Sequence, residues 1–131
     1  MLASIFAEIR NTLKNDSTIQ TLLGGEYVYV AHVSQTNQIP SINLSESTER
    51  CKKRPGYDTD LHRDNESVIQ VDVWSKKSVL ETLNIANRCD TILVTDSVSG
   101  TYGWQKISDS DLFEDETRLY HKAMRYSFGY V

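Results

Sequence analysis

The sequence predicts an α+β fold built on a mostly antiparallel sheet of about four to five strands. Two segments, 2–13 and 79–93, carry apolar residues at helical spacing. Three others, 68–75, 101–107 and 120–130, alternate apolar and polar residues as strands do. Because the predicted strands outnumber the helices and mostly follow one another along the chain, we expect one sheet covered by an N-terminal helix and one longer helix.

The length and composition indicate a single globular domain. The 131 residues can bury about two-thirds of the unfolded surface, enough for one sheet and a helical layer. Hydrophobic residues make up 39% and charged residues 24%, so the composition is not that of a disordered chain. A net charge of −4 argues against a nucleic-acid-binding protein, which needs a concentrated basic face. We predict one domain over residues 1–131, without a membrane span.

The first helix is predicted from apolar residues at three- and four-residue steps: Leu2, Ile5, Phe6, Ile9 and Leu13. The Asn-Asp pair at 15–16 breaks this pattern. Ser17 and Gln20 then form a predicted capping box for a short second helix, which the Gly-Gly pair at 24–25 ends.

Segments 27–33 and 40–47 are rich in strand-forming residues, and Pro40 opens the second. No apolar period survives from 47 to 65, so we predict a long loop there. Segment 67–75 resumes strand alternation. Its two faces carry Ile69, Val71 and Val73 on one side and Gln70, Asp72 and Trp74 on the other.

Ser78 and Glu81 form a second predicted capping box at the start of the longer helix. Its core line comprises Val79, Leu83, Ala86, Asp90 and Leu93, widened by Ile85, Cys89 and Ile92. Gly100 precedes a strand at 101–107. The closing strand has a predicted core face of Tyr120, Met124, Tyr126, Phe128 and Tyr130, with His121, Ala123, Arg125 and Ser127 facing the other way.

An acidic cluster precedes the closing strand and contains Asp109, Asp111, Glu114, Asp115 and Glu116. A calcium loop of the EF-hand type needs oxygen ligands at alternate positions and a central glycine. Here Leu112 and Phe113 occupy ligand positions and glycine is absent. We therefore interpret the cluster as a solvated turn, with Leu112 and Phe113 packed into the core.

The remaining candidates for chemistry lack the required spacing. Cys51, Asp58, Asp60 and His62 are candidates for a zinc or Cys–His site, but structural zinc needs close pairs such as C-x-x-C, and none occurs. His32 and His121 lie far apart, and no G-x-S-x-G motif is present. Cys51 and Cys89 are expected to be free thiols. We predict that the protein is not an enzyme and needs no metal or other cofactor.

The strongest local charge feature is the run at 52–54 in the long loop. It is either a solvated loop tip or a docking contact to an acidic partner, which would supply orientation and weaken with salt. The candidate interface comprises Lys52, Lys53, Arg54, Tyr57, His121 and Arg125.

Three stretches in order along the chain resemble the tail-completion, or tail-terminator, proteins of long-tailed bacteriophages. They are "TIQTLLGG", "SVIQVDVWSKKSVLETLNIANRCDTIL" and "DLFEDETRLYHKAMRYSFGYV". The likeness is strongest over Val68–Leu93 and Asp111–Tyr130. One departure is that the family's closing turn tends to read Thr-Gly-Leu-Tyr, whereas this chain has Arg118 in place of the glycine. The resemblance therefore leaves the geometry of this turn open.

The resemblance implies a structural virion protein, made in the host cytoplasm, that forms a hexameric ring on the head-proximal end of the tail tube. It implies contacts with the tail tube protein and with the head–tail connector or stopper protein, and a lumen through which DNA passes without sequence-specific binding. The acidic balance suits such a lumen because it repels phosphate. A neck or head-completion subunit is the nearest alternative; a small binding module or an enzyme of unrecognised type is the other.

Overall fold

The computed structural model describes residues 2–30, 39–46, 65–96, 98–116 and 118–130. The described helices are α1 (Leu2–Asn15), α2 (Ser17–Leu23) and α3 (Val79–Asp90), and α3 continues into a π-helical segment, Thr91–Asp96. The strands are β1 (Val28–Val30), β2 (Ser41–Glu46), β3 (Asn65–Ser75), β4 (Thr101–Glu114) and β5 (Leu119–Tyr130). This is the α+β class that the sequence predicts.

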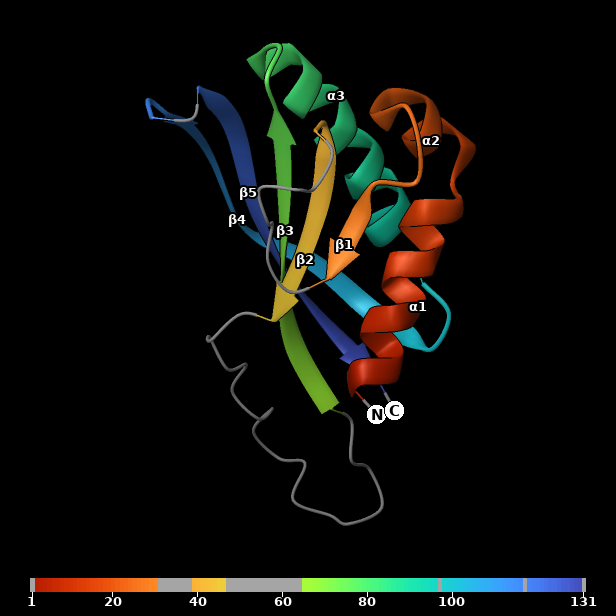
Figure 1. The fold of residues 1–131 in the computed structure, drawn as a ribbon. Coiled ribbons are helices and arrows are strands. Elements are labelled where there is room, and N and C mark those ends of the chain that lie inside the picture. Colours follow the sequence, from red (N-terminus) through yellow and green to blue (C-terminus); the bar gives the residue numbers. More distant parts are fainter. Residues whose placement is uncertain (1, 31–38, 47–64, 97, 117, 131) are drawn as a thin grey trace, which may run out of the picture.

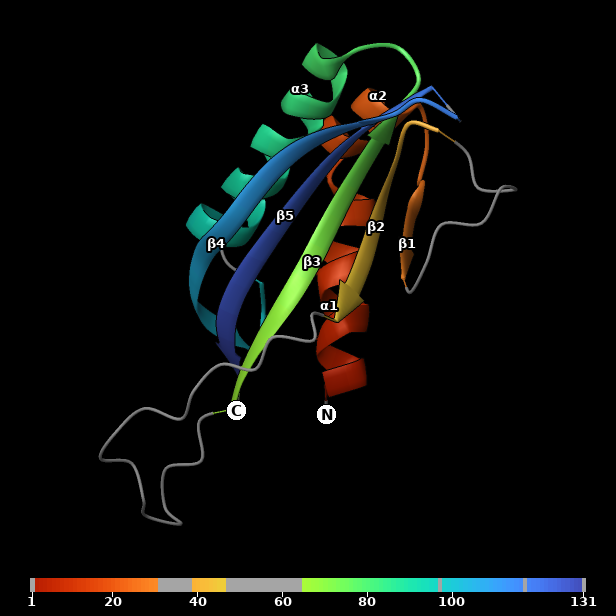
Figure 2. The ribbon, with the colours of Figure 1, turned by 90° about the vertical axis from the view of Figure 1, so that its left-hand side faces the viewer.

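The strands form one sheet in the order β1-β2-β3-β5-β4. The pair β1–β2 is parallel, and the other three pairs are antiparallel, as the prediction of a mostly antiparallel sheet requires. The closing strand β5 does not lie at an edge but between β3 and β4. The described helices all lie on one face, so Figure 2 looks directly onto the opposite face of the sheet. We call this second surface the open face.

The corner between α1 and α2 corrects one detail of the predicted capping. Asp16, not Ser17, is the N-cap of α2, and its carboxylate accepts a hydrogen bond from the backbone N–H of Ile19 at 3.0 Å. The end of α2 is as predicted, because Gly24 adopts the left-handed conformation with φ 76°. The two helices therefore turn within a single residue.

Helix α3 begins at the predicted cap, where Ser78 Oγ accepts from the backbone N–H of Glu81. A full capping box would also have the Glu81 carboxylate accept from the backbone N–H of Ser78. This part of the prediction is wrong, because the carboxylate accepts instead from Ser75 Oγ at 2.6 Å. The predicted core line is also wrong at its start: Val79 and Leu83 are 49% and 39% exposed. The buried side of the helix comprises Thr82, Ile85, Ala86 and Cys89.

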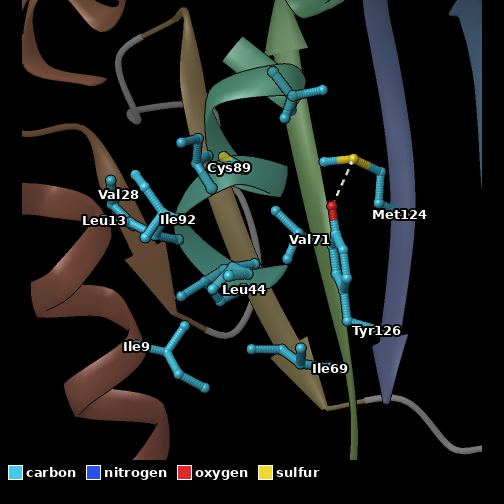
Figure 3. Packing of buried hydrophobic residues seen from close by; sticks show 14 of the residues in the cluster. Ile9, Leu13, Val28, Leu44, Ile69, Val71, Cys89, Ile92, Met124 and Tyr126 are labelled. Carbon is cyan, nitrogen blue, oxygen red and sulfur yellow. Dashed lines mark hydrogen bonds between the residues drawn. The ribbon is translucent and has the colours of Figure 1, made fainter. Parts of the chain in front are cut away.

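The core lies between the helices and the sheet (Figure 3). Ile69, Val71 and Val73 of β3 and Met124, Tyr126 and Phe128 of β5 point into it, which confirms both predicted strand faces. The Tyr126 hydroxyl donates to Asp90 of α3 and also lies 3.3 Å from Met124 Sδ. Cys89 is fully buried beside them, and this desolvation raises the pKa of its thiol to about 12.

Strand β4 is longer than expected and overturns the interpretation of the acidic cluster. It runs through Asp109 and Asp111 to Glu114, so the turn is confined to the residues after Glu114. Leu112 and Phe113 are 53% and 49% exposed and do not enter the core. β4 therefore continues past the point where the helices cover the sheet, and Figure 1 shows the β4–β5 hairpin bending away from the helices.

Arg118 adopts φ 56° in the turn before β5, and its N–H donates to the Glu114 carbonyl at 2.8 Å. This is the position at which the resemblance leads us to expect glycine. Positive φ is costly for a side chain with a Cβ but not for glycine. The turn therefore retains the left-handed conformation without the residue type that suits it best.

Candidate interaction surfaces

Side chains from β3 and β5 meet on the open face of the sheet. The register places Trp74 opposite His121, Asp72 opposite Ala123 and Gln70 opposite Arg125. Since strand side chains alternate, the residues on the core side and those on the open face come from interleaved positions of the same strands. The open face thus brings together His121 and Arg125, both of which belong to the predicted interface.

These residues form a connected series of contacts, which we call the open-face network: Gln70, Asp72, Trp74, His121 and Arg125. The rings of Trp74 and His121 stack at 3.9 Å between centroids with 7° between their planes. His121 Nε2 lies 2.7 Å from Asp72 Oδ1, and Gln70 Nε2 donates to both Asp72 carboxylate oxygens at 3.0 and 3.2 Å. Arg125 Nε donates to Gln70 Oε1 at 3.4 Å.

Part of the network is shielded from solvent although it lies on the face opposite the helices. Asp72 is only 6% exposed, and the His121 side chain is 12% exposed. Trp74 Nε1 is shielded from solvent and has no acceptor among the described residues. A shielded indole N–H without a partner costs roughly 1–3 kcal/mol. An acceptor from outside the described residues would therefore be favoured at this point.

The contacts of His121 can be compared with those of a catalytic histidine. An Asp–His pair supports nucleophilic catalysis only when a hydroxyl or thiol lies within hydrogen-bond reach of the ring. Within the described part of the chain, the recorded contacts of the His121 ring are with Asp72 and Trp74. Among all the residues that the structure describes, no group of three or more His, Cys, Asp or Glu could hold a metal ion.

A charged cluster fastens the β4–β5 hairpin on the helix side of the sheet. Lys122, with a side chain 6% exposed, lies 2.8 Å from Asp109, and Lys106 lies 2.8 Å from Asp90 and 3.2 Å from Asp109. Desolvation lowers the pKa of Lys122, but its hydrogen bonds to Asp109 and Asp111 outweigh this effect, so its pKa is raised. Desolvation raises the pKa of Asp109, but the hydrogen bonds from Lys122 and Lys106 lower it by more. The pKa of Asp109 is therefore below its ordinary value.

The other predicted interface residues, Lys52, Lys53, Arg54 and Tyr57, lie outside the described residues, as do His32, Cys51, Asp58, Asp60 and His62. Sequence reasoning missed Gln70, Asp72 and Trp74 as members of the site. The alternation of β3 places them on one face, which is a usable signal. It did not identify them because their contacts depend on the register with β5, which a single sequence does not reveal.

Comparison with known proteins first gives the class of protein. A chain from the structure entitled "Virion of native gene transfer agent (GTA) particle" has the same fold, with a TM-score of 0.68 and 12% identity over 95% of this chain and 92% of that one. A family model described as "Tail completion protein gp17" matches residues 7–130. The chain therefore belongs to this family and is a structural tail protein of a phage-type virion. No curated protein sequence matches it. Among the described residues, none of the helices is long and apolar enough to cross a membrane.

Proposed function

We propose that this protein caps the head-proximal end of the tail tube, stops its polymerisation and provides the joint to the head connector. The observation that supports this most directly is the family match, which spans residues 7–130. Tail completion requires a subunit that contacts unlike neighbours on different surfaces. The fold offers such surfaces, because the open face, the β4 edge and the helical layer are separate in space (Figures 1 and 2).

The proposed form is a hexameric ring around a lumen through which DNA passes without sequence-specific contact. A head-to-tail interface that rotates by the right angle closes into a ring, whereas one that does not close produces a filament. The edge strand β4, from Thr101 to Glu114, presents backbone groups that a neighbour can pair with or cover. The net charge of −4 favours a lumen that repels phosphate.

The partners in this proposal are further copies of the chain, the tail tube protein and the connector or stopper protein. The open-face network is the first candidate for one of these contacts, because it combines an aromatic stack, an Arg side chain and a shielded donor, Trp74 Nε1. Aromatic residues and Arg are enriched among the side chains that dominate protein–protein affinity. Lys52, Lys53 and Arg54 are proposed to dock on an acidic partner.

Electron microscopy of tails from phage that lack this protein tests the proposal. We expect overlong tails without heads, because nothing ends polymerisation or completes the joint. Tails of normal length joined to heads would refute it. Tails of normal length that lack heads would instead favour a neck or head-completion subunit, the second candidate.

Charge reversal at residues 52–54 tests the docking contact separately. We expect Lys52→Glu, Lys53→Glu and Arg54→Glu together to reduce joining while leaving the thermal unfolding midpoint unchanged. The control is Lys14→Glu, a single charge reversal at the end of α1, far along the chain from residues 52–54. Unaltered joining by the triple variant removes residues 52–54 from the interface.

A further inference from the structure

The tip of the β4–β5 hairpin exposes an apolar surface with acidic residues beside it. Phe113, 49% exposed, pairs with Tyr120 of β5, and the two rings lie 4.9 Å apart on the same face of the hairpin. Leu112, 53% exposed, pairs with His121 and lies on the other face. Asp115 and Glu116 lie in the turn after β4 and are exposed. We call Phe113, Tyr120, Asp115 and Glu116 the tip patch. Exposed apolar side chains that gather in one place, instead of being scattered singly, mark contact surfaces.

The start of α3 exposes a second apolar surface, this one with basic residues beside it. Val79, Leu80 and Leu83 are 49%, 64% and 39% exposed. Lys76 and Lys77 precede them, are exposed, and form no ion pair with another described residue. We call these five residues the α3 patch. Glu81 is the nearest acidic residue of the helix, but its carboxylate is taken up by Ser75.

The two patches are opposite in charge and alike in apolar character. Glu114, Asp115 and Glu116 outnumber Arg118 at the tip, so the tip patch is acidic, whereas Lys76 and Lys77 make the α3 patch basic. Apolar burial supplies most of the affinity in such a contact, and complementary charge supplies orientation and selects the partner. Each patch therefore has the composition that the other requires.

The patches do not satisfy each other within one chain. Both lie at the same end of the sheet, because Ser75 at the end of β3 pairs with Tyr120 at the start of β5. Figure 1 shows the hairpin tip bending away from the helices while α3 starts on the helix side. Their large exposed fractions confirm that neither covers the other.

We propose that the tip patch of one subunit docks on the α3 patch of a second copy of this chain. Such a contact is heterologous, since it joins two different surfaces, and repetition leaves one free patch of each kind until the assembly closes. The inference rests on the proposed ring for its biological setting, but it specifies which surfaces meet. The charged part of the contact weakens with salt, whereas the apolar part does not.

Two matched double variants and a photo-crosslinker test this contact with the purified protein. The variants are Asp115→Lys with Glu116→Lys, and Lys76→Glu with Lys77→Glu. Phe113 is replaced by benzoylphenylalanine in both variants and in the chain without charge reversals. Adducts between chains are mapped by mass spectrometry. In the background without reversals we expect adducts on residues 76–83. Each double variant alone should form about tenfold less adduct, because like charges then face each other.

The mixture of the two variants gives the sharpest result. A reversed tip then meets a reversed α3 patch, and an original tip meets an original α3 patch, so alternating contacts are again complementary. We expect the mixture to recover most of the lost adduct. Recovery also rules out misfolding as the cause of the loss, because mixing cannot refold a misfolded chain.

Adducts outside residues 76–83, adducts insensitive to both reversals, or none at millimolar protein would each overturn the inference. Adducts on the tip itself would identify a symmetric contact between two tips instead. Because this experiment uses no tails, its failure is separable from that of the proposed function. Overlong tails with the wrong adducts refute only the docking contact, whereas normal tails with the expected adducts refute only the capping role.

Discussion

Arg88 of α3 forms two hydrogen bonds to the carboxylate of Asp16. Asp16 lies 72 positions earlier in the chain and is also the N-cap of α2. Arg88 Nη2 donates to Asp16 Oδ1 at 2.7 Å, and Nε donates to Oδ2 at 3.0 Å. One carboxylate thus ends the turn between two helices and attaches that corner to a third. Paired hydrogen bonds of this kind are stronger and more directional than a single ion contact.

Removal of the Asp16 carboxylate should destabilise the fold more than removal of the Arg88 guanidinium. We expect Asp16→Ala to lower the free energy of unfolding by roughly 2–3 kcal/mol, because it loses both the cap and the Arg88 contact. Arg88→Ala should cost roughly 1 kcal/mol, since the pair is partly exposed. Urea denaturation measures both, with the exposed Glu8→Ala as control. Equal costs would show that the cap contributes nothing.

The Asp16 contact should also make stability depend on acid. The hydrogen bond from Arg88 holds the pKa of Asp16 below its ordinary value of 3.8. The unfolded chain therefore takes up the proton at a higher pH than the folded chain. The stabilisation is complete above about pH 5 and is lost as the pH falls towards and below 3. Asp16→Asn should flatten the dependence of the urea midpoint over this range, and an unchanged slope would contradict the assignment.

Cys89 should be inert in the native protein. Full burial raises the pKa of its thiol to about 12, so at pH 8 it is both protonated and inaccessible. In a Cys51→Ser background, we expect an aromatic disulfide reagent to label no thiol until denaturant unfolds the chain, and then to label one. Rapid labelling without denaturant would show that α3 opens readily.

The open-face network should tolerate a hydrogen-bonding substitute for its histidine better than a small apolar one. His121→Ala removes both the Trp74 stack and a contact to the shielded Asp72 carboxylate, so we expect a loss of roughly 1–2 kcal/mol. His121→Gln retains a donor and should lose less. Thermal unfolding measures the difference, and near-UV circular dichroism reports the Trp74 environment. Identical losses would mean that the Asp72 contact is not stabilising.

Glycine at position 118 should stabilise the hairpin. Arg118 has φ 56°, a conformation that costs a residue with a side chain roughly 1 kcal/mol and glycine much less. Part of this gain is offset by the greater freedom of glycine in the unfolded chain. We expect Arg118→Gly to raise the urea midpoint slightly, with Arg118→Ala as the control that keeps the strain. A gain shared by both variants would point to charge, not to backbone geometry.

Local patterns in the sequence were sufficient for the elements and many of their faces. Alternation placed Ile69, Val71 and Met124 in the core, and Gly24 marked the end of α2 because left-handed backbone favours glycine. The failures arose where two local signals competed. Asp16 and Ser17 are both good caps. Val79 and Ile85 both fit a helical stripe, and only the position of the sheet decides which side is buried.

The site was less accessible, because it depends on contacts between distant residues. His121 was identified as an open-face residue, but Asp72 lies 49 positions earlier, and only the register joins them. Leu112 and Phe113 were expected in the core because large apolar residues usually are. They are exposed because β4 extends past the helical layer, a length that the acidic cluster concealed.

The central position of β5 sets an order of events during synthesis. β3 has no partner on one side until residues 119–130 have emerged, and β4 depends on the same segment for all of its recorded pairing. In a nascent chain that stops at residue 114, β3 would have one unpaired edge and β4 would lack its pairing with β5. Such unpaired edges can pair with other nascent chains on the polysome. Insertion of β5 between β3 and β4 is thus the step that completes the sheet.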